Sequence, residues 1–259
     1  MRMMKKVLGT VTVLALSVSL LAGCGSTAAS PVSSAASTAA ESTTSSVVSE
    51  TTSAAADENE AAAAQLLNDL TGSYQELWPV ILADEYQQTW LDDCTALVGE
   101  ENAEAAFEKL SSMVTSDVYG EDAVEAYANG GGAYFCGFTN SLATLTFDGE
   151  TSTISGTDKD GNVLFSHTYH YIGMEPVHGL YEFESDDADS GEFTYFFLAP
   201  DTSAETYHIE FRYGSDAEAL SQYDAGEYAY WLASGISTDC DQTMIDNCIE
   251  LFCTENLAG

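Results

Sequence analysis

Short strand-like segments separated by turn signals fill residues 133–214, and this run most constrains the fold. Its apolar and aromatic stretches are 133–138, 142–147, 153–155, 163–171, 180–184 and 192–198. Asp148-Gly149 and Lys159-Asp160-Gly161-Asn162 lie between them and are typical of tight turns. With one further strand at residues 205–213, the pattern predicts seven or eight short strands, and hence an antiparallel barrel or sandwich.

The last of these segments, residues 205–214, alternates strictly between two kinds of side chain. One side is apolar, and the other is polar or ionisable: Tyr207, Ile209 and Phe211 against Thr206, His208, Glu210 and Arg212. Period-two alternation predicts a half-buried strand. Its polar side combines a carboxylate and a cation with one of only four histidines in the chain. This makes the polar side a candidate site. The alternative is a strand whose outer face is simply charged.

Helical patterns flank the strand-rich region on both sides. Residues 61–70 are strong helix formers that end at Thr71-Gly72. Ser73 and Glu76 then fit a capping box, which predicts a further helix that Pro79 kinks or ends. An amphipathic helix is expected over 101–114, and another over 238–252. The sequence predicts a mainly β, α+β domain at 58–259, with helices at about 58–129, a barrel at about 133–214 and a C-terminal helix at about 238–252.

The first 57 residues have the pattern of an export signal and a linker. Three cations, Arg2, Lys5 and Lys6, precede an apolar run at 7–21, which predicts a secretory signal peptide over residues 1–23. Leu21-Ala22-Gly23-Cys24 resembles the lipobox of bacterial lipoproteins, and this resemblance implies that Cys24 is diacylated. The chain is then expected in the cell envelope, anchored by lipid on the outer face of the bacterial membrane. Residues 24–57 are rich in Ser, Thr and Ala, which predicts a disordered tether.

Charge excludes one class of partner. The chain has 42 acidic residues against 6 Lys and Arg. Removal of residues 1–23 leaves only Lys109, Lys159 and Arg212 as cations. Such a negative field repels phosphate backbones, so nucleic acid is excluded as a partner. The same field attracts metal cations, but only diffusely.

The cysteines fit an oxidising compartment. With Cys24 assigned to the lipid, an odd number remains, and two disulfides with one thiol is the simplest expectation; the pairing stays open among Cys94, Cys136, Cys240, Cys248 and Cys253. No G-x-S-x-G, H-E-x-x-H or P-loop motif occurs, so the sequence predicts no enzyme and no catalytic residue.

Five motifs, taken in chain order, resemble those of one known family. They are Asp69-Leu-Thr-Gly-Ser-Tyr-Gln-Glu-Leu-Trp-Pro-Val-Ile81, Thr168-Tyr-His-Tyr-Ile-Gly173, Leu180-Tyr-Glu-Phe-Glu184, Tyr207-His-Ile-Glu-Phe-Arg-Tyr-Gly-Ser215 and the aromatic cluster Tyr228-Ala-Tyr-Trp231. Over about residues 66–253 the chain is similar to the ZinT (YodA) family, which also forms the C-terminal domain of AdcA-type zinc-binding lipoproteins. The resemblance implies a calycin, lipocalin-like barrel with added helices and a zinc-recruiting role in the envelope.

The resemblance also implies where a metal site lies, and the site is degenerate. Of the family's three histidine ligands, one is carried over to His208; Thr206 and Pro200 stand at the other two positions, with Asp201 directly after Pro200. Zinc needs three or four N, O or S donors. Glu210 projects to the same strand face as His208. We therefore predict a rebuilt site from His208, Glu210, Asp201 and His167, with His170 as the alternative to His167.

Such a set suits zinc, or manganese if carboxylates dominate. A simpler alternative is that His208 is a barrel histidine hydrogen-bonded to Glu210 or to a tyrosine. The functional prediction is a divalent-metal-binding envelope lipoprotein, with a metal-uptake transporter as a further expected partner. The alternatives are a metal-free calycin-type module for a small molecule or a partner protein, and an envelope carbohydrate-active enzyme with two carboxylates about 5–10 Å apart.

Overall fold

The computed structural model describes residues 47–199 and 208–258. The compact folded unit is Asp57–Gly259. The predicted signal peptide, Cys24 and Asp201 lie outside the described residues, and so does most of the predicted tether. Those assignments stay predictions.

Eight described strands close into one barrel. They are β1 (Gly72–Glu76), β2 (Thr144–Asp148), β3 (Thr153–Thr157), β4 (Val163–Met174), β5 (Tyr181–Ser185), β6 (Tyr195–Leu198), β7 (His208–Gly214) and β8 (Ala233–Ser237). Each strand pairs antiparallel with the next, and β1 pairs antiparallel with β8. Closure removes the open strand edges that would otherwise attract other chains. The predicted calycin-like antiparallel barrel with flanking helices is confirmed.

The two strands that close the barrel come from outside the region that the sequence assigned to it. The prediction of a capped helix at Ser73 is wrong, because Ser73 and Glu76 lie in β1. β1 pairs with β2 through Tyr74 and Leu145 and with β8 through Tyr74 and Ser237. Hydrogen bonds to strands on both sides outweigh a local preference for a helix cap. The expected strand at 133–138 is also wrong, since only isolated bridges at Phe135 occur there.

Aromatic rings fill the interior of the barrel. Phe196 on β6 and Tyr213 on β7 are fully buried, and their ring centroids lie 5.4 Å apart. Phe211, Phe183 and Trp231 are equally buried in the same cluster. Rings at such separations pack favourably beyond the area that they bury. The interior is therefore a packed core and not an open lipocalin-type cup.

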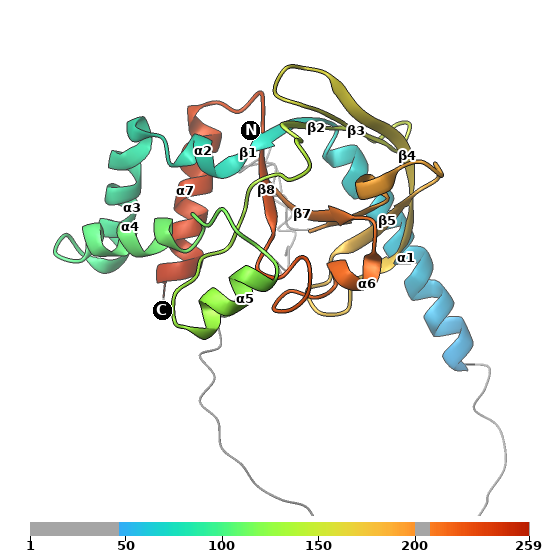
Figure 1. Cartoon of the computed structure of the whole chain (residues 1–259), viewed down its shortest axis with the longest axis horizontal. Helices are drawn as coiled ribbons and strands as arrows, with labels where there is room; N and C mark the ends of the chain where they lie inside the picture. Colours follow the sequence, from blue (N-terminus) through green and yellow to red (C-terminus); the bar gives the residue numbers. More distant parts are fainter. Residues whose placement is uncertain (1–46, 200–207, 259) are drawn as a thin grey trace, which may run out of the picture. The chain divides into compact units, whose positions relative to one another are not determined.

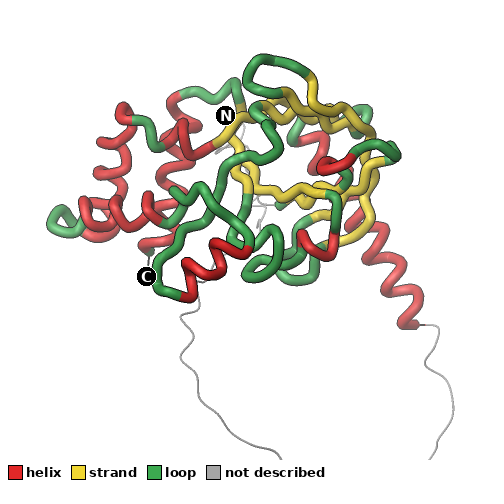
Figure 2. Tube along the Cα trace, in the orientation of Figure 1, coloured by secondary structure: helices red, strands yellow, loops and turns green. Residues whose placement is uncertain are grey.

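Helices make up the rest of the fold, and four of them form a layer against the barrel. The described helices are α1 (Val47–Asp69), α2 (Leu77–Ile81), α3 (Gln87–Val98), α4 (Ala103–Ser112), α5 (Glu121–Ala128), α6 (Ala217–Leu220) and α7 (Gln242–Leu257). Helix α3 packs on α4 and α7, and α2 contacts both α7 and β8 (Figure 1). We call α2, α3, α4 and α7 the helical layer; Figure 2 shows these helices gathered beside the strands.

A local capping signal sets the start of α7. Asp241 caps the start of α7, where its carboxylate accepts the N–H of Met244 at 3.0 Å. The predicted helix at 238–252 is thus present with shifted ends.

Helix α1 begins at Val47, inside the segment assigned to the tether. Among helices of the described ranges, none combines the length and apolarity needed to cross a bilayer.

Candidate functional site

Strand β7 directs its two kinds of side chain to two different places. Ile209, Phe211 and Tyr213 point into the barrel and belong to its core. His208 and Arg212 lie on the opposite face, yet they are only 8% and 0% exposed. Glu210 lies between them on that face and is half-buried. The polar face of the strand is therefore covered by other elements of the fold and does not face open solvent.

His208 and Glu210 line a small cavity between β7 and the helical layer. Helix α2 contributes Leu77, Trp78 and Ile81 to its wall, and helix α7 contributes Cys248, Leu251, Phe252 and Glu255. The cavity has a volume of about 30 Å³. A cavity of roughly 10–15 Å³ holds one water molecule, whereas pockets for organic ligands measure roughly 300–1,000 Å³. The cavity therefore has room for an ion or for one or two water molecules.

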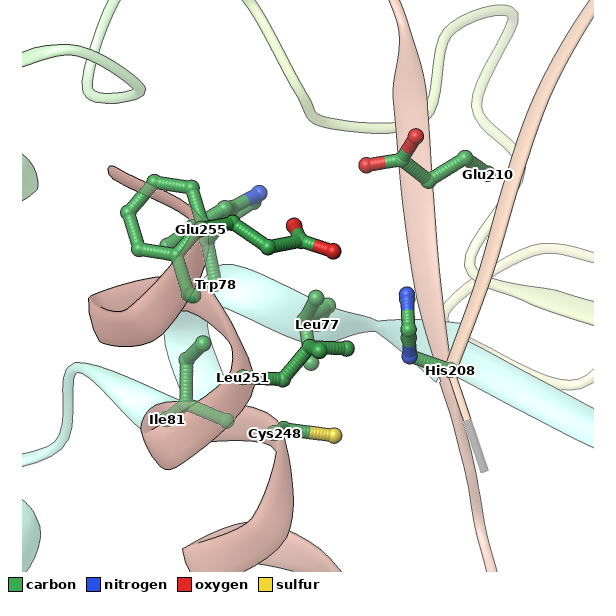
Figure 3. Close-up of a pocket in the computed structure, with 9 residues that line it drawn as sticks. Leu77, Trp78, Ile81, His208, Glu210, Cys248, Leu251 and Glu255 are labelled. Carbon is green, nitrogen blue, oxygen red and sulfur yellow. The ribbon is translucent and has the colours of Figure 1, made fainter. Parts of the chain in front are cut away.

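Four of the lining side chains carry metal-binding atoms. Figure 3 shows the carboxylates of Glu210 and Glu255 directed toward each other, with the Cys248 sulfur directed toward His208. Together they offer an imidazole nitrogen, carboxylate oxygens and a sulfur. Across the residues that the structure describes, no three His, Cys, Asp or Glu side chains already stand close enough together to hold an ion. Binding would thus require these side chains to move inward, as ligands of many metal sites do.

Burial controls the state of the thiols at this site. Burial, and to a smaller degree the nearby Cys240, raises the pKa of the Cys248 thiol to about 12. Cys248 is therefore a neutral thiol near pH 7, and a metal ion would have to displace its proton. Burial, and then the charge of Glu210, raises the pKa of the Cys136 thiol as well.

Two other predicted ligands, His167 and His170, do not line this cavity, and Asp201 lies outside the described residues. His167 lies on β4, where its Nδ1 is 3.0 Å from a carboxylate oxygen of Asp187. Its ring stacks on Phe165, a member of the barrel core. His167 therefore lies on the inner face of β4, whereas His208 lies on the outer face of β7. His170 is exposed, and its Nδ1 lies 2.7 Å from Oδ1 of Asp186. The sequence pattern indicated which face each histidine takes, but not which strands meet.

Arg212, the third polar residue of β7, has a structural role. Its guanidinium donates hydrogen bonds to the backbone carbonyls of Leu220, Gln222 and Tyr228, and it lies 4.2 Å from the ring centroid of Tyr223. These contacts fix the segment between α6 and β8 against β7. Burial lowers the pKa of Arg212, and the neighbouring Tyr223 acts in the opposite sense. The polar face of β7 therefore has two parts. His208 and Glu210 form a wall of the cavity, and Arg212 forms a buried clamp, by which we mean its hydrogen bonds to the three carbonyls.

Cys248 and Glu255 are the two site residues that the sequence did not single out. They are seven residues apart on α7, which is two helical turns, so they face the same side. This spacing was visible in the sequence. What the sequence did not show is that this side of α7 meets the polar side of β7.

Some solved structures are similar to this chain, whereas no family model and no curated protein matches it. One is the Zn(II)-bound ZinT-like domain of Streptococcus pneumoniae AdcA, with 16% identity and a TM-score of 0.45, covering 71% of this chain and 89% of that one. The other is Zn(II)-bound AdcA from the same organism, with 14% identity and a TM-score of 0.42. That match covers 72% of this chain and 35% of AdcA. The fold described above rests on the strand pairing itself.

Proposed function

We propose that this domain binds a divalent metal ion, zinc in the first place, in the cavity between β7 and α7. The observation that carries the proposal is the convergence of His208 and Glu210 from the strand with Cys248 and Glu255 from the helix on one small cavity. The family resemblance of the motifs in the sequence supports a metal-related role. The metal is here a bound cargo and not a reagent of a reaction.

The donor chemistry fits zinc. Zinc accepts imidazole nitrogen, thiolate sulfur and carboxylate oxygen, usually four donors in a tetrahedron. His208, Glu210, Glu255 and Cys248 supply one nitrogen, carboxylate oxygens and one sulfur. A site without the thiol would shift the preference toward manganese, because carboxylates are harder ligands. Cys248 is therefore the residue expected to favour zinc.

The size of the cavity distinguishes this proposal from a calycin-type module for small molecules. A cavity of about 30 Å³ holds an ion but no organic molecule of ordinary size. The barrel interior is filled by buried rings such as Phe196, Phe211 and Trp231. A partner-binding role without metal stays the second candidate, and the titration described below distinguishes the two.

The proposal includes an envelope location. The signal-like N-terminus and Cys24 support a lipid anchor on the outer face of the membrane, and a metal-uptake transporter is the expected recipient of the ion. Metabolic labelling with a radioactive fatty acid tests the anchor. Label is expected in the wild-type chain and absent from Cys24→Ala, and label in both would contradict it.

The metal proposal is tested by calorimetric titration of the metal-stripped protein with Zn²⁺. Saturable binding of one ion, tighter than about 10 µM, is expected. His208→Ala and Glu255→Gln should each weaken it by about tenfold or more, since each removes one donor. His170→Ala and Glu250→Gln are matched controls. His170 is a histidine on another strand, β4, and Glu250 is a glutamate on α7, and neither side chain lines the cavity. Absence of saturable binding, or equal effects in the controls, would overturn the proposal.

A further inference from the structure

Two cysteines from distant parts of the sequence meet inside the helical layer. The Sγ atoms of Cys94 on α3 and Cys253 on α7 lie 3.9 Å apart, although the residues are separated by 159 positions in the chain. Both side chains are fully buried. The neighbouring rings Trp90 and Phe252 also contact each other, with centroids 5.9 Å apart, and so help to set the register of the two helices. None of the five cysteines in the described ranges is joined in a disulfide, so the two disulfides expected from the sequence are not present.

We propose that Cys94 and Cys253 form a disulfide when the chain folds in an oxidising compartment. A disulfide has an S–S length of about 2.05 Å, so the two sulfurs would have to approach by about 1.9 Å from their present separation. Rotation about the Cα–Cβ bond of each cysteine moves its sulfur without moving the backbone. The helices that carry the two residues are already packed against each other.

The chemistry is thiol–disulfide exchange with a disulfide-bearing oxidant, either a small molecule or a protein. The thiolate of one cysteine attacks a sulfur of the oxidant, which forms a mixed disulfide and releases one thiol of the oxidant. The second cysteine, as its thiolate, then displaces the other half of the oxidant. Two protons and two electrons pass from the protein to the oxidant, which leaves as two thiols. The products are the Cys94–Cys253 disulfide and the reduced oxidant.

Burial indicates when this exchange takes place. Both side chains are fully buried in the folded protein. An oxidant therefore has no access to either sulfur once the two helices are packed together. The exchange belongs to the folding stage, before α3 and α7 close over the pair. Once formed, the disulfide would be shielded from reductants for the same reason.

The disulfide would tie α7 to α3, and α7 carries Cys248 and Glu255 of the cavity. The proposal does not depend on metal binding, because it rests only on the contact of the two sulfurs. It predicts that the helical layer keeps its packing under conditions that would otherwise separate its helices. Cys240 and Cys248 stay thiols in this arrangement.

The test uses the full chain exported by a bacterial host and unfolded in N-ethylmaleimide without reductant. Digestion with a protease specific for Glu and Asp suits a chain with so few Lys and Arg. Mass spectrometry should find the peptides of Cys94 and Cys253 joined and lighter by two hydrogens, with neither cysteine alkylated. Cys136, Cys240 and Cys248 should carry the reagent. Alkylation of Cys94 and Cys253, or a different joined pair, would overturn the proposal.

A second measurement compares melting temperatures with and without a phosphine reductant present during unfolding. Reduction should lower the Tm of the wild type by about 5–10 °C, because it releases a long loop in the unfolded chain. Cys240→Ser is the matched control and should show the same drop, whereas Cys94→Ser should show none. An equal drop in Cys94→Ser would contradict the proposal. The mass measurement on the wild type decides the matter even if a variant fails to fold.

Discussion

The barrel interior and the helical layer are both closely packed, but they are built from different side chains. The barrel core consists of stacked rings and aliphatic residues and contains no cysteine among its described members. The core of the helical layer contains Cys94, Cys136, Cys248 and Cys253, with Cys240 packed at its edge. The cavity with His208 and Glu210 lies at the boundary between the two. The comparison indicates that the barrel is the scaffold, that the cysteines gather in the helical layer, and that the metal-binding side chains lie where this layer meets the outer wall of the barrel.

The largest effect is expected from a cavity in the barrel core. Phe196 is fully buried and contacts the rings of Tyr169 and Tyr213. Phe196→Ala should lower the free energy of unfolding by about 3–5 kcal/mol, because the closely packed rings around it cannot move in to fill the space that the ring leaves. Urea denaturation measures this, with Val163→Ala, at a position 70% exposed, as the control. Equal stability of the two variants would show that the barrel is not the scaffold.

Removing the clamp on the outer face of β7 should have the next largest effect. Arg212→Met leaves the carbonyls of Leu220, Gln222 and Tyr228 without their donor. We expect a loss of about 3 kcal/mol in the same urea experiment. Arg212→Lys keeps the charge but not the planar set of donors, so it should lie between wild type and Arg212→Met. If the lysine variant is as unstable as the methionine variant, the hydrogen bonds outweigh the charge.

High pH should destabilise the barrel through its buried tyrosines. Burial raises the pKa of Tyr213 and of Tyr169 above the ordinary value of 10.0. The unfolded chain therefore releases these protons first as the pH rises. The stability is fully present below pH 10 and is lost progressively above it. Urea midpoints between pH 8 and pH 11, with tyrosinate absorbance as a second readout, check this. A midpoint constant up to pH 11 would contradict it.

A smaller effect is expected on the pH dependence of zinc binding. The Cys248 thiol, with its pKa raised to about 12 by burial, must lose a proton when it binds the metal. Between pH 6 and pH 8 the affinity of the wild type should therefore rise about tenfold more per pH unit than that of Cys248→Ser. Competition with a chelating dye measures both slopes, and Cys240→Ser serves as the control. Parallel slopes would remove the thiol from the metal site.

The smallest effect belongs to a surface pair on the barrel. His170 lies 2.7 Å from Asp186, but the two side chains are 51% and 53% exposed. Water and ions screen such a pair, so His170→Ala should change the free energy of unfolding by less than about 0.5 kcal/mol. The variant should also bind zinc like the wild type. A loss above 1 kcal/mol would mean that this hairpin contributes more to the barrel than its exposure indicates.

Much of the fold was predictable because its signals are local. The alternation along β4 to β7 and the turn residues Asp148-Gly149 indicate strands whatever their neighbours are. Ser73 and Glu76 misled for the same reason: locally they fit a helix cap, and only pairing with β2 and β8 makes them a strand. Strand β8 was missed because Ala233, Gly235 and two serines make up most of its sequence. Its inclusion depends on pairing with β7, which precedes it, and with β1 from the start of the domain.

What the sequence by itself determined is the alternation along β7, and with it the placement of His208 and Glu210 on one face of one strand. Period two is a property of the strand backbone and needs no partner. The tertiary structure alone decided what covers that face. It brought α7 with Cys248 and Glu255 against His208, and left His167 beside Asp187. Contacts between residues far apart in the chain depend on how whole elements pack, and no local pattern encodes that packing.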